Sequence, residues 1–251
     1  MSARRLGLLL DQTTSYGRGV AAGIRRQALP QSDLRLLVAE PSVAAVQRWS
    51  EDPPDAVIAH IADPEVLAAL RRLGRPLVNV SNHFGREADD LPRVRADDVA
   101  IGRMAAEHVI ERRFSRAVYL GYAGRAYSDQ RRDGFIARLA EAGIPVEEGP
   151  SPGVEGPGPE AAAWLAGRDL PLVAFVLGDE YAAAVMKACR SVGLGVPEPV
   201  AVLSGSSDPQ ICALTQPPLS AVHLDVEAIG VAAAKLVCDL LAGAPAPAGP
   251  V

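Results

Sequence analysis

The sequence predicts an α/β protein of two lobes, each built around a parallel sheet. Short apolar runs alternate along the chain with longer segments in which apolar residues recur every three or four positions, the pattern of strands and helices in turn. The first run, Leu6–Leu10, is continuously apolar, as expected of a strand buried on both faces. The alternation stops at a polar loop over 81–95 and then starts again, which indicates a second lobe.

Composition limits the classes of function. Of the 251 residues, 49% are apolar and 22% are charged, a normal mixture for a globular protein with a core. The net charge of −5 argues against a general electrostatic attraction to nucleic acid or to an anionic membrane. The three cysteines and the four histidines are scattered and form neither a metal-ligand pattern nor a disulfide framework.

The N-terminus lacks the features of a signal peptide, and no apolar run approaches the roughly 18 residues of a membrane span. We therefore expect a cytoplasmic protein that contacts no membrane and holds neither a cofactor nor a metal ion.

The first series of elements covers roughly residues 1–95. Strands are expected at the apolar runs 6–10, 34–39, 56–59 and 77–80. Helices are expected after Tyr16, with Val20, Ile24 and Ala28 on one face, and over 43–49 and 64–73. The third of these helices begins at Pro64, and Gly74 ends it.

The second series opens with a helix that starts at Asp98 and organises the rest of the chain. Asp97 is expected to cap it, because a carboxylate there can accept hydrogen bonds from first-turn N–H groups. Four residues recur at helical spacing and are therefore expected to face a core: Ile101, Met104, Ala105 and His108. A strand at 117–121 and a polar, aromatic loop then lead into a helix that ends at Ala142.

The remaining elements complete a second lobe over roughly 97–222. Strands are expected at 172–177 and 200–203 with an extended segment at 220–222, and helices at 160–165 and 179–190. The Gly- and Pro-rich segment 147–159 is expected to be a mobile surface loop. The helix 226–241 could belong to either lobe on periodicity alone, and 244–251 is typical of a linker.

Polar side chains follow several of the predicted strands. Those at strand ends or at the helix starts behind them are Asp11, Tyr16, Arg131, Asp179 and Asp208. Ligands of α/β proteins bind at the carboxyl ends of parallel strands. A polyol needs carboxylates that accept from its hydroxyls, an arginine that donates, and an aromatic ring that covers an apolar face.

Each of these residues also has a structural interpretation. Asp179 could cap its helix, and Arg131 could instead form a salt bridge with Asp129 or Asp133. Asn79, at the end of a strand, could line a ligand cleft or satisfy a local turn.

Five spaced motifs resemble the sugar-sensing domain of bacterial transcription regulators of the LacI/GalR type, and most nearly its xylose-regulator (XylR) branch. They are Tyr16-Gly17-Arg18-Gly19; Asp97-Asp98-x-Ala100-Ile101-Gly102-x-x-Ala105-x-x-His108; Ser128-x-x-Arg131-x-x-Gly134-Phe135; Gly193-Leu194-x-Val196-Pro197-Glu198-x-Val200-Ala201-Val202-Leu203; and Pro217-Pro218-Leu219-Ser220-x-Val222.

This resemblance implies a periplasmic-binding-protein-like fold of type I. Its two doubly wound, Rossmann-like lobes are joined by three crossovers and hold an effector in the cleft between them. By analogy the helix 226–241 returns to the N-terminal lobe, which then comprises 1–95 and 226–243. The C-terminal lobe comprises 97–222, and 244–251 is a linker toward a DNA-binding domain. In the xylose branch that domain is of the AraC type, and no segment of this sequence resembles a helix-turn-helix.

The resemblance also assigns site residues. Arg131 and Asp179 match positions that contact effector, and Tyr127 stands where the xylose branch tends to carry Trp. That branch usually reads Gly-x-Asp-Asn-Asp/Glu after the strand at 200–203, so Ser206 replaces a carboxylate that grips sugar hydroxyls. A serine cannot accept as a charged group, so D-xylose is not the expected effector.

The expected function is therefore the sensing of a small molecule, a carbohydrate, for a bacterial transcription regulator. We expect DNA contact only through a domain outside this sequence, and a homodimer. A solute-binding protein for sugar uptake is the alternative, and it would need an export signal. An enzyme is not expected, because the sequence contains no nucleophile elbow and no P-loop.

Overall fold

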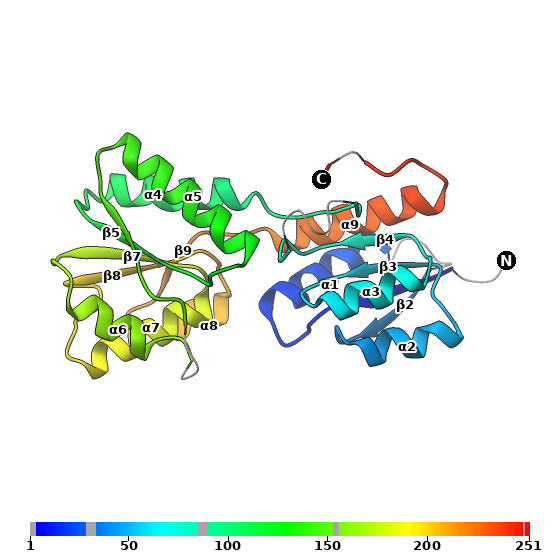
Figure 1. Cartoon of the computed structure of the whole chain (residues 1–251), viewed down its shortest axis with the longest axis horizontal. Helices are drawn as coiled ribbons and strands as arrows, with labels where there is room; N and C mark the ends of the chain where they lie inside the picture. The colour runs from blue at the N-terminus through cyan, green and yellow to red at the C-terminus, as the bar shows by residue number, and fades with distance from the viewer. Residues whose placement is uncertain (1–3, 29–33, 85–89, 153–155, 248) are drawn as a thin grey trace. The chain divides into compact units, whose positions relative to one another are not determined.

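The computed structural model describes residues 4–28, 34–84, 90–152, 156–247 and 249–251 (Figure 1). The chain forms two compact units: unit 1 comprises Met1–Ala96 and Asp225–Val251, and unit 2 comprises Asp97–Leu224. Parts of four expected segments lie outside the described residues: the extreme N-terminus, the polar loop 81–95, the loop 147–159 and the linker 244–251. Among the described residues, no helix has the length and apolar character that a membrane span requires.

Unit 1 contains a four-stranded parallel sheet in the order β2-β1-β3-β4. Its strands are β1 (Arg4–Leu9), β2 (Leu34–Ala39), β3 (Ala56–Ala59) and β4 (Leu77–Asn79). In register, Leu8 of β1 lies between Val38 of β2 and Ile58 of β3. The carboxyl ends of all four strands therefore lie at one edge of this sheet.

Helices cover both faces of the unit 1 sheet (Figure 1). They are α1 (Ser15–Ala28), α2 (Val43–Glu51), α3 (Pro64–Arg72) and α9 (Val226–Leu241). Because side chains alternate along a strand, Leu6 and Leu8 pack with α1 and α9, whereas Leu9 packs with α2 and α3. The continuous apolar run at the start of the sequence is buried on both faces, as predicted.

The helix at 226–241 belongs to unit 1, where α9 packs closely on α1. Two glycines face each other at this contact. A Cβ on Gly23 would collide with the carbonyl of Glu227, and a Cβ on Gly230 would collide with the carbonyl of Val20. The lack of side chains at both positions is what allows the two backbones to approach.

Unit 2 contains a five-stranded parallel sheet in the order β6-β5-β7-β8-β9. Its strands are β5 (Ala117–Leu120), β6 (Val146–Glu148), β7 (Leu172–Val176), β8 (Val200–Ser204) and β9 (Ser220–Ala221). The helices are α4 (Asp98–Glu111), α5 (Ala126–Glu141), α6 (Pro159–Ala166), α7 (Asp179–Ser191) and the short α8 (Pro209–Leu214). In Figure 1, α4 and α5 lie on one face of this sheet and α6 and α7 on the other.

Aromatic side chains fill the core under α4 and α5. Phe135 of α5 is fully buried, and its ring lies 4.8 Å from that of Phe175 on β7. Tyr119 of β5 also packs against Phe175, at 5.6 Å between ring centroids. The two parallel sheets with helices on both faces confirm the predicted fold class.

The structure corrects three expectations. The short strand β6 lies at the start of the segment that we expected to be loop, and its two acidic residues, Glu147 and Glu148, are exposed at the edge of the sheet. The helix α8 was not expected, because its six residues include no buried side chain that would give a periodic signal. Met104 does not face the core but is 57% exposed, and His108 is only half-buried.

The buried face of α4 is displaced from the predicted stripe by a fraction of a turn. It consists of Asp98, Ile101, Gly102, Ala105, Ala106 and Val109. The two glycines of the α4–α5 contact explain the displacement: a Cβ on Gly102 would collide with the carbonyl of Arg131, and one on Gly134 with that of Val99. The small residues of α4, rather than its largest apolar one, set the buried face.

Candidate functional site

Asp11 follows β1 at the carboxyl edge of the unit 1 sheet. Its Oδ1 accepts hydrogen bonds from the backbone N–H of Thr13, at 2.9 Å, and from the Thr13 hydroxyl, at 2.5 Å. The hydroxyl contact is the main reason that the pKa of Asp11 lies below its usual value. Asp11 is therefore held as a carboxylate by a local turn.

Tyr16 and His60 lie together at the same edge. The Tyr16 hydroxyl donates to the carbonyl of Val80 at 2.6 Å, and the Tyr16 ring lies 5.5 Å from the His60 ring. Burial lowers the pKa of His60, and the nearby Asp11 carboxylate opposes this shift only in part. His60 is therefore a neutral imidazole that can both donate and accept.

His60 is not among the site residues expected from the sequence. The available signal is its position, since His60 directly follows β3 and Asp11 likewise comes just after β1.

Asn79 is only 2% exposed, and its Oδ1 accepts from the backbone N–H of Ser81 at 2.9 Å. The Ser81 hydroxyl donates in turn to the carbonyl of Ile61 at 2.5 Å. Of the two interpretations of Asn79, the local turn is therefore present in the structure.

The stability of the protein is expected to fall as the pH drops below the usual histidine pKa of 6.5. Because burial depresses the pKa of His60, the unfolded chain binds a proton between the two pKa values that the folded chain does not bind. The stability lost in this pH window should be smaller in His60→Gln. Urea unfolding at pH about 7.5 and about 5.5 measures the difference. The exposed His223 gives the matched control, because His223→Gln should keep the pH dependence of the unaltered protein.

Arg131, in α5 of unit 2, contacts three other segments of that unit. Its Nε donates to Oδ1 of Asp98 at 2.9 Å, and the two side chains are 10% and 3% exposed. Its Nη1 donates to the carbonyls of Leu177, at 2.9 Å, and Gly205, at 3.1 Å. Arg131 thus ties the first turn of α4 to the segments that follow β7 and β8.

The predicted partners of Arg131 were wrong. Asp129 and Asp133 pair instead with Arg132, at 3.2 Å and 2.8 Å. Asp98 lies 33 positions away from Arg131 and becomes its neighbour only because α4 and α5 pack together. Asp97, one residue earlier, caps α4 as predicted, accepting from the N–H of Ala100 at 2.9 Å.

Asp179 opens α7 and accepts two backbone hydrogen bonds. Its Oδ1 accepts from the N–H of Glu180 at 2.9 Å, and its Oδ2 accepts from the N–H of Asp208 at 2.5 Å. Its own N–H donates to the Ser206 hydroxyl at 3.1 Å. Each carboxylate oxygen of Asp179 keeps a lone pair with which it could accept from a ligand.

Asp208 and Ser206 have structural contacts of their own. Asp208 caps α8, since its Oδ1 accepts from the N–H groups of Gln210 and Ile211 at 2.8 and 3.4 Å. Ser206 holds the N-terminus of α7 through the contact with Asp179. Tyr127 completes the cluster, because the Arg131 guanidinium lies 5.8 Å from the centre of its ring.

The structure therefore brings the predicted site residues together in two groups, one within each unit. Asp11 and Tyr16 lie with His60 at the carboxyl edge of the unit 1 sheet. Tyr127, Arg131, Asp179, Ser206 and Asp208 form one connected group at the carboxyl edge of the unit 2 sheet.

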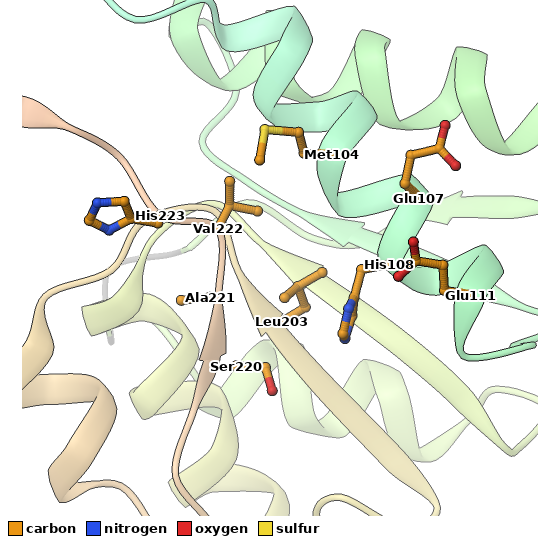
Figure 2. A pocket seen from close by; sticks show the side chains of 9 residues that line it. All are labelled: Met104, Glu107, His108, Glu111, Leu203, Ser220, Ala221, Val222 and His223. Carbon is orange, nitrogen blue, oxygen red and sulfur yellow. The ribbon is translucent and has the colours of Figure 1, made fainter.

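A separate open pocket of about 350 Å³ lies between α4 and the strands β8 and β9 (Figure 2). It is lined by Met104, Glu107, His108, Glu111, Leu203, Ser220, Ala221, Val222 and His223. None of the predicted site residues lines it. Its histidines and glutamates hold no metal site, since the described residues contain no group of three or more ligating side chains.

Comparison with known proteins agrees with this architecture. Residues 106–251 match the family model of the periplasmic binding protein-like domain. The chain is 24% identical over 256 residues to the xylose operon regulatory protein of Haemophilus influenzae, covering 95% of this chain and 65% of that protein. It is 31% identical over 195 residues to the HTH-type transcriptional regulator MalR of Streptomyces coelicolor, covering 74% of this chain and 55% of that protein.

The solved complex of the transcriptional regulator CelR with cellobiose has the same fold. It superimposes with a TM-score of 0.79 over 100% of this chain and 82% of that one, at 22% sequence identity. The family match covers more than half of the chain, and both of these curated relatives are transcription regulators. The chain therefore belongs to the periplasmic binding protein-like domain family, as an effector-binding domain of the LacI/GalR type.

Proposed function

We propose that this chain senses a small carbohydrate for a bacterial transcription regulator and transmits binding to a separate DNA-binding domain. The observation that carries the proposal is the connected group of Arg131, Asp179, Ser206 and Asp208 at the carboxyl edge of the unit 2 sheet. The chain spans 65% and 55% of the two curated relatives, so the activity of the whole protein is part of the proposal.

The polar groups of this cluster suit a polyol. No described residue accepts a hydrogen bond from Nη2 of Arg131, so both of its hydrogens are available to a hydroxyl oxygen. The oxygens of Asp179 offer lone pairs to hydroxyl hydrogens, and the Tyr127 ring offers an apolar face. Unit 1 has polar groups of its own that suit a polyol: Asp11 is an acceptor, and His60 is both a donor and an acceptor. Asn79 is a supporting member of this proposed unit 1 group, through its amide NH₂ group.

The cluster also argues against D-xylose as the best ligand. The Ser206 hydroxyl already accepts from the N–H of Asp179, which leaves it one proton to donate and no charge with which to accept. Sugar hydroxyls that would donate to a carboxylate at this position therefore have no charged acceptor there. Asp179 and Arg131 then provide most of the polar contacts to the ligand.

Asp179→Ala is expected to weaken the best ligand about tenfold to hundredfold, because a charge-assisted hydrogen bond contributes about 1.5–3 kcal/mol. The ligand is first found by thermal shift with pentoses, hexoses, uronic acids and sugar phosphates, since a true effector raises the melting temperature with concentration. Calorimetry then compares the unaltered protein, Asp179→Ala and Ser206→Asp. Ser206→Asp should favour D-xylose relative to the unaltered protein.

Asp133→Ala is the matched control, because Asp133 lies on the solvent side of α5 and pairs with Arg132. It should leave the affinity unchanged. An unchanged affinity in Asp179→Ala, or D-xylose as the strongest ligand of the unaltered protein, would contradict the proposed site. No response to any carbohydrate would contradict the proposed ligand class.

The proposal has three corollaries. The full protein is a homodimer, because regulators present two DNA-reading domains to repeated half-sites. It acts in the cytoplasm, where its operator lies. It acts as a regulator rather than as an enzyme, like the two curated relatives named above. Solute transport is not proposed for the same reason.

A further inference from the structure

Four charged side chains are buried at the carboxyl edge of the unit 2 sheet. As a whole residue Arg131 is 8% exposed, and the three aspartates that accompany it, Asp98, Asp179 and Asp208, are 2%, 6% and 6% exposed. These four buried side chains together contain one guanidinium and three carboxylates. An ionised group is costly to bury unless an opposite charge or hydrogen bonds compensate it, so the charges of these side chains bear on the charge of any ligand beside them.

The positive charge of Arg131 is already compensated within the protein. Asp98 lies 2.9 Å from Nε, and the carbonyls of Leu177 and Gly205 accept from Nη1 at 2.9 and 3.1 Å. The Nη2 group of Arg131 remains available to a ligand as a hydrogen-bond donor. The charge of the guanidinium is balanced by Asp98. Such a donor suits a hydroxyl oxygen, whereas a phosphate or carboxylate would need the uncompensated charge.

The two helices that begin in the cluster do not favour an anion either. The N-terminus of a helix attracts negative charge through its free N–H groups. At α7 the Asp179 carboxylate stands in the first turn, and at α8 the Asp208 carboxylate caps the first N–H groups. The protein's own carboxylates therefore occupy the places that an anionic ligand would take.

The group in unit 1, taken by itself, offers no cation to an anionic ligand. Asp11 is a carboxylate with a lowered pKa, and burial keeps the pKa of His60 below its usual value.

We infer that this site accepts uncharged sugars and rejects phosphorylated and acidic ones, and that Asp98 enforces the choice by neutralising Arg131. The sugar part of this inference rests on the proposed function. Asp98 is a positioning residue, because it acts on the ligand through Arg131. The part of the charge selection that Asp98 carries acts through the buried ion pair with Arg131, so it can be tested without any sugar.

The test is Asp98→Asn, with inorganic phosphate as the probe. An asparagine oxygen can still accept from Nε of Arg131, so the geometry is kept while the negative charge is removed. At constant ionic strength, phosphate should not raise the melting temperature of the unaltered protein. It should raise that of Asp98→Asn, with binding at least about tenfold tighter, as expected for a newly exposed charge-assisted hydrogen bond.

Two controls isolate the cause. Asp133→Asn removes a carboxylate from the exposed side of α5, where it pairs with Arg132, and should bind phosphate no better than the unaltered protein. In the double variant Asp98→Asn, Arg131→Gln the response to phosphate should disappear, because the cation has been removed.

A second measurement needs no substitution and applies even if Asp98→Asn does not fold. D-glucose 6-phosphate and D-glucuronate are compared with D-glucose on the unaltered protein by thermal shift, and neither anion should exceed the uncharged sugar. Stabilisation of the unaltered protein by phosphate or by either anion, or the absence of a phosphate response in folded Asp98→Asn, overturns the inference. If no sugar binds but phosphate stabilises only Asp98→Asn, the charge selection stands and the proposed carbohydrate ligand fails.

Discussion

Replacing Arg131 with alanine is expected to destabilise unit 2 by about 3–5 kcal/mol, because it leaves a buried carboxylate without its cation. The Asp98 side chain is 3% exposed, so water cannot take the place of the guanidinium without rearrangement of α4. The carbonyls of Leu177 and Gly205 would lose their donor as well. Ligand affinity should fall with stability, since Nη2 is part of the proposed site. Urea unfolding followed by circular dichroism measures the loss.

A double-mutant cycle assigns that loss to the pair. Asp98→Ala, Arg131→Ala should lose clearly less than the sum of the two single variants, because it leaves neither charge unpaired. Arg132→Ala is the matched control on the same helix, and it should cost less than about 1 kcal/mol because its ion pairs are at the surface. Additive losses in the double variant would show that the ion pair does not hold the site together.

The strands and helices that could be predicted from the sequence are those with a strong local signal. The strand Ala56–Ala59 is continuously apolar, and the helix Val226–Leu241 has a periodic apolar face, so both were predicted with the bounds that the structure gives them. The strand β6 carries two exposed glutamates, and α8 has no buried residue, so neither has a local hydrophobic signal. Elements at a sheet edge or on a surface are stabilised by tertiary context that a local pattern does not contain.

The candidate site shows the same division. Asp11, Arg131 and Asp179 could be selected because each lies just after a predicted strand or in the helix behind it, and parallel strands bring such residues to the carboxyl edge of their own sheet. The partner of Arg131 could not be selected. Asp98 approaches it only because Gly102 and Gly134 let α4 and α5 pack closely, and that contact has no signature in the spacing of charges along the chain.

Phe135→Ala is expected to destabilise unit 2 by about 3–5 kcal/mol, the usual cost of removing a fully buried aromatic side chain. Phe135 is 0% exposed and packs against Phe175 at 4.8 Å between ring centroids. It also lies one helical turn after Arg131, so its ring fixes the rotation and height of α5 over the sheet. The loss is measured by urea unfolding. Asp133→Ala, on the exposed side of the same helix, should stay within about 0.5 kcal/mol of the unaltered protein.

The cost should lie near the upper end of that range, because the surroundings cannot collapse into the cavity. Closure would require α5 to move against α4, but the backbone of α4 already meets α5 at Gly102 and Gly134, where no Cβ could be accommodated. The cavity therefore stays open, and its volume adds to the lost transfer energy. Ligand affinity at a temperature where the variant is still folded should change less than in Arg131→Ala, since every polar group of the proposed site is retained. A cost below about 2 kcal/mol would show that α4 and α5 can slide past each other, against the close glycine contacts.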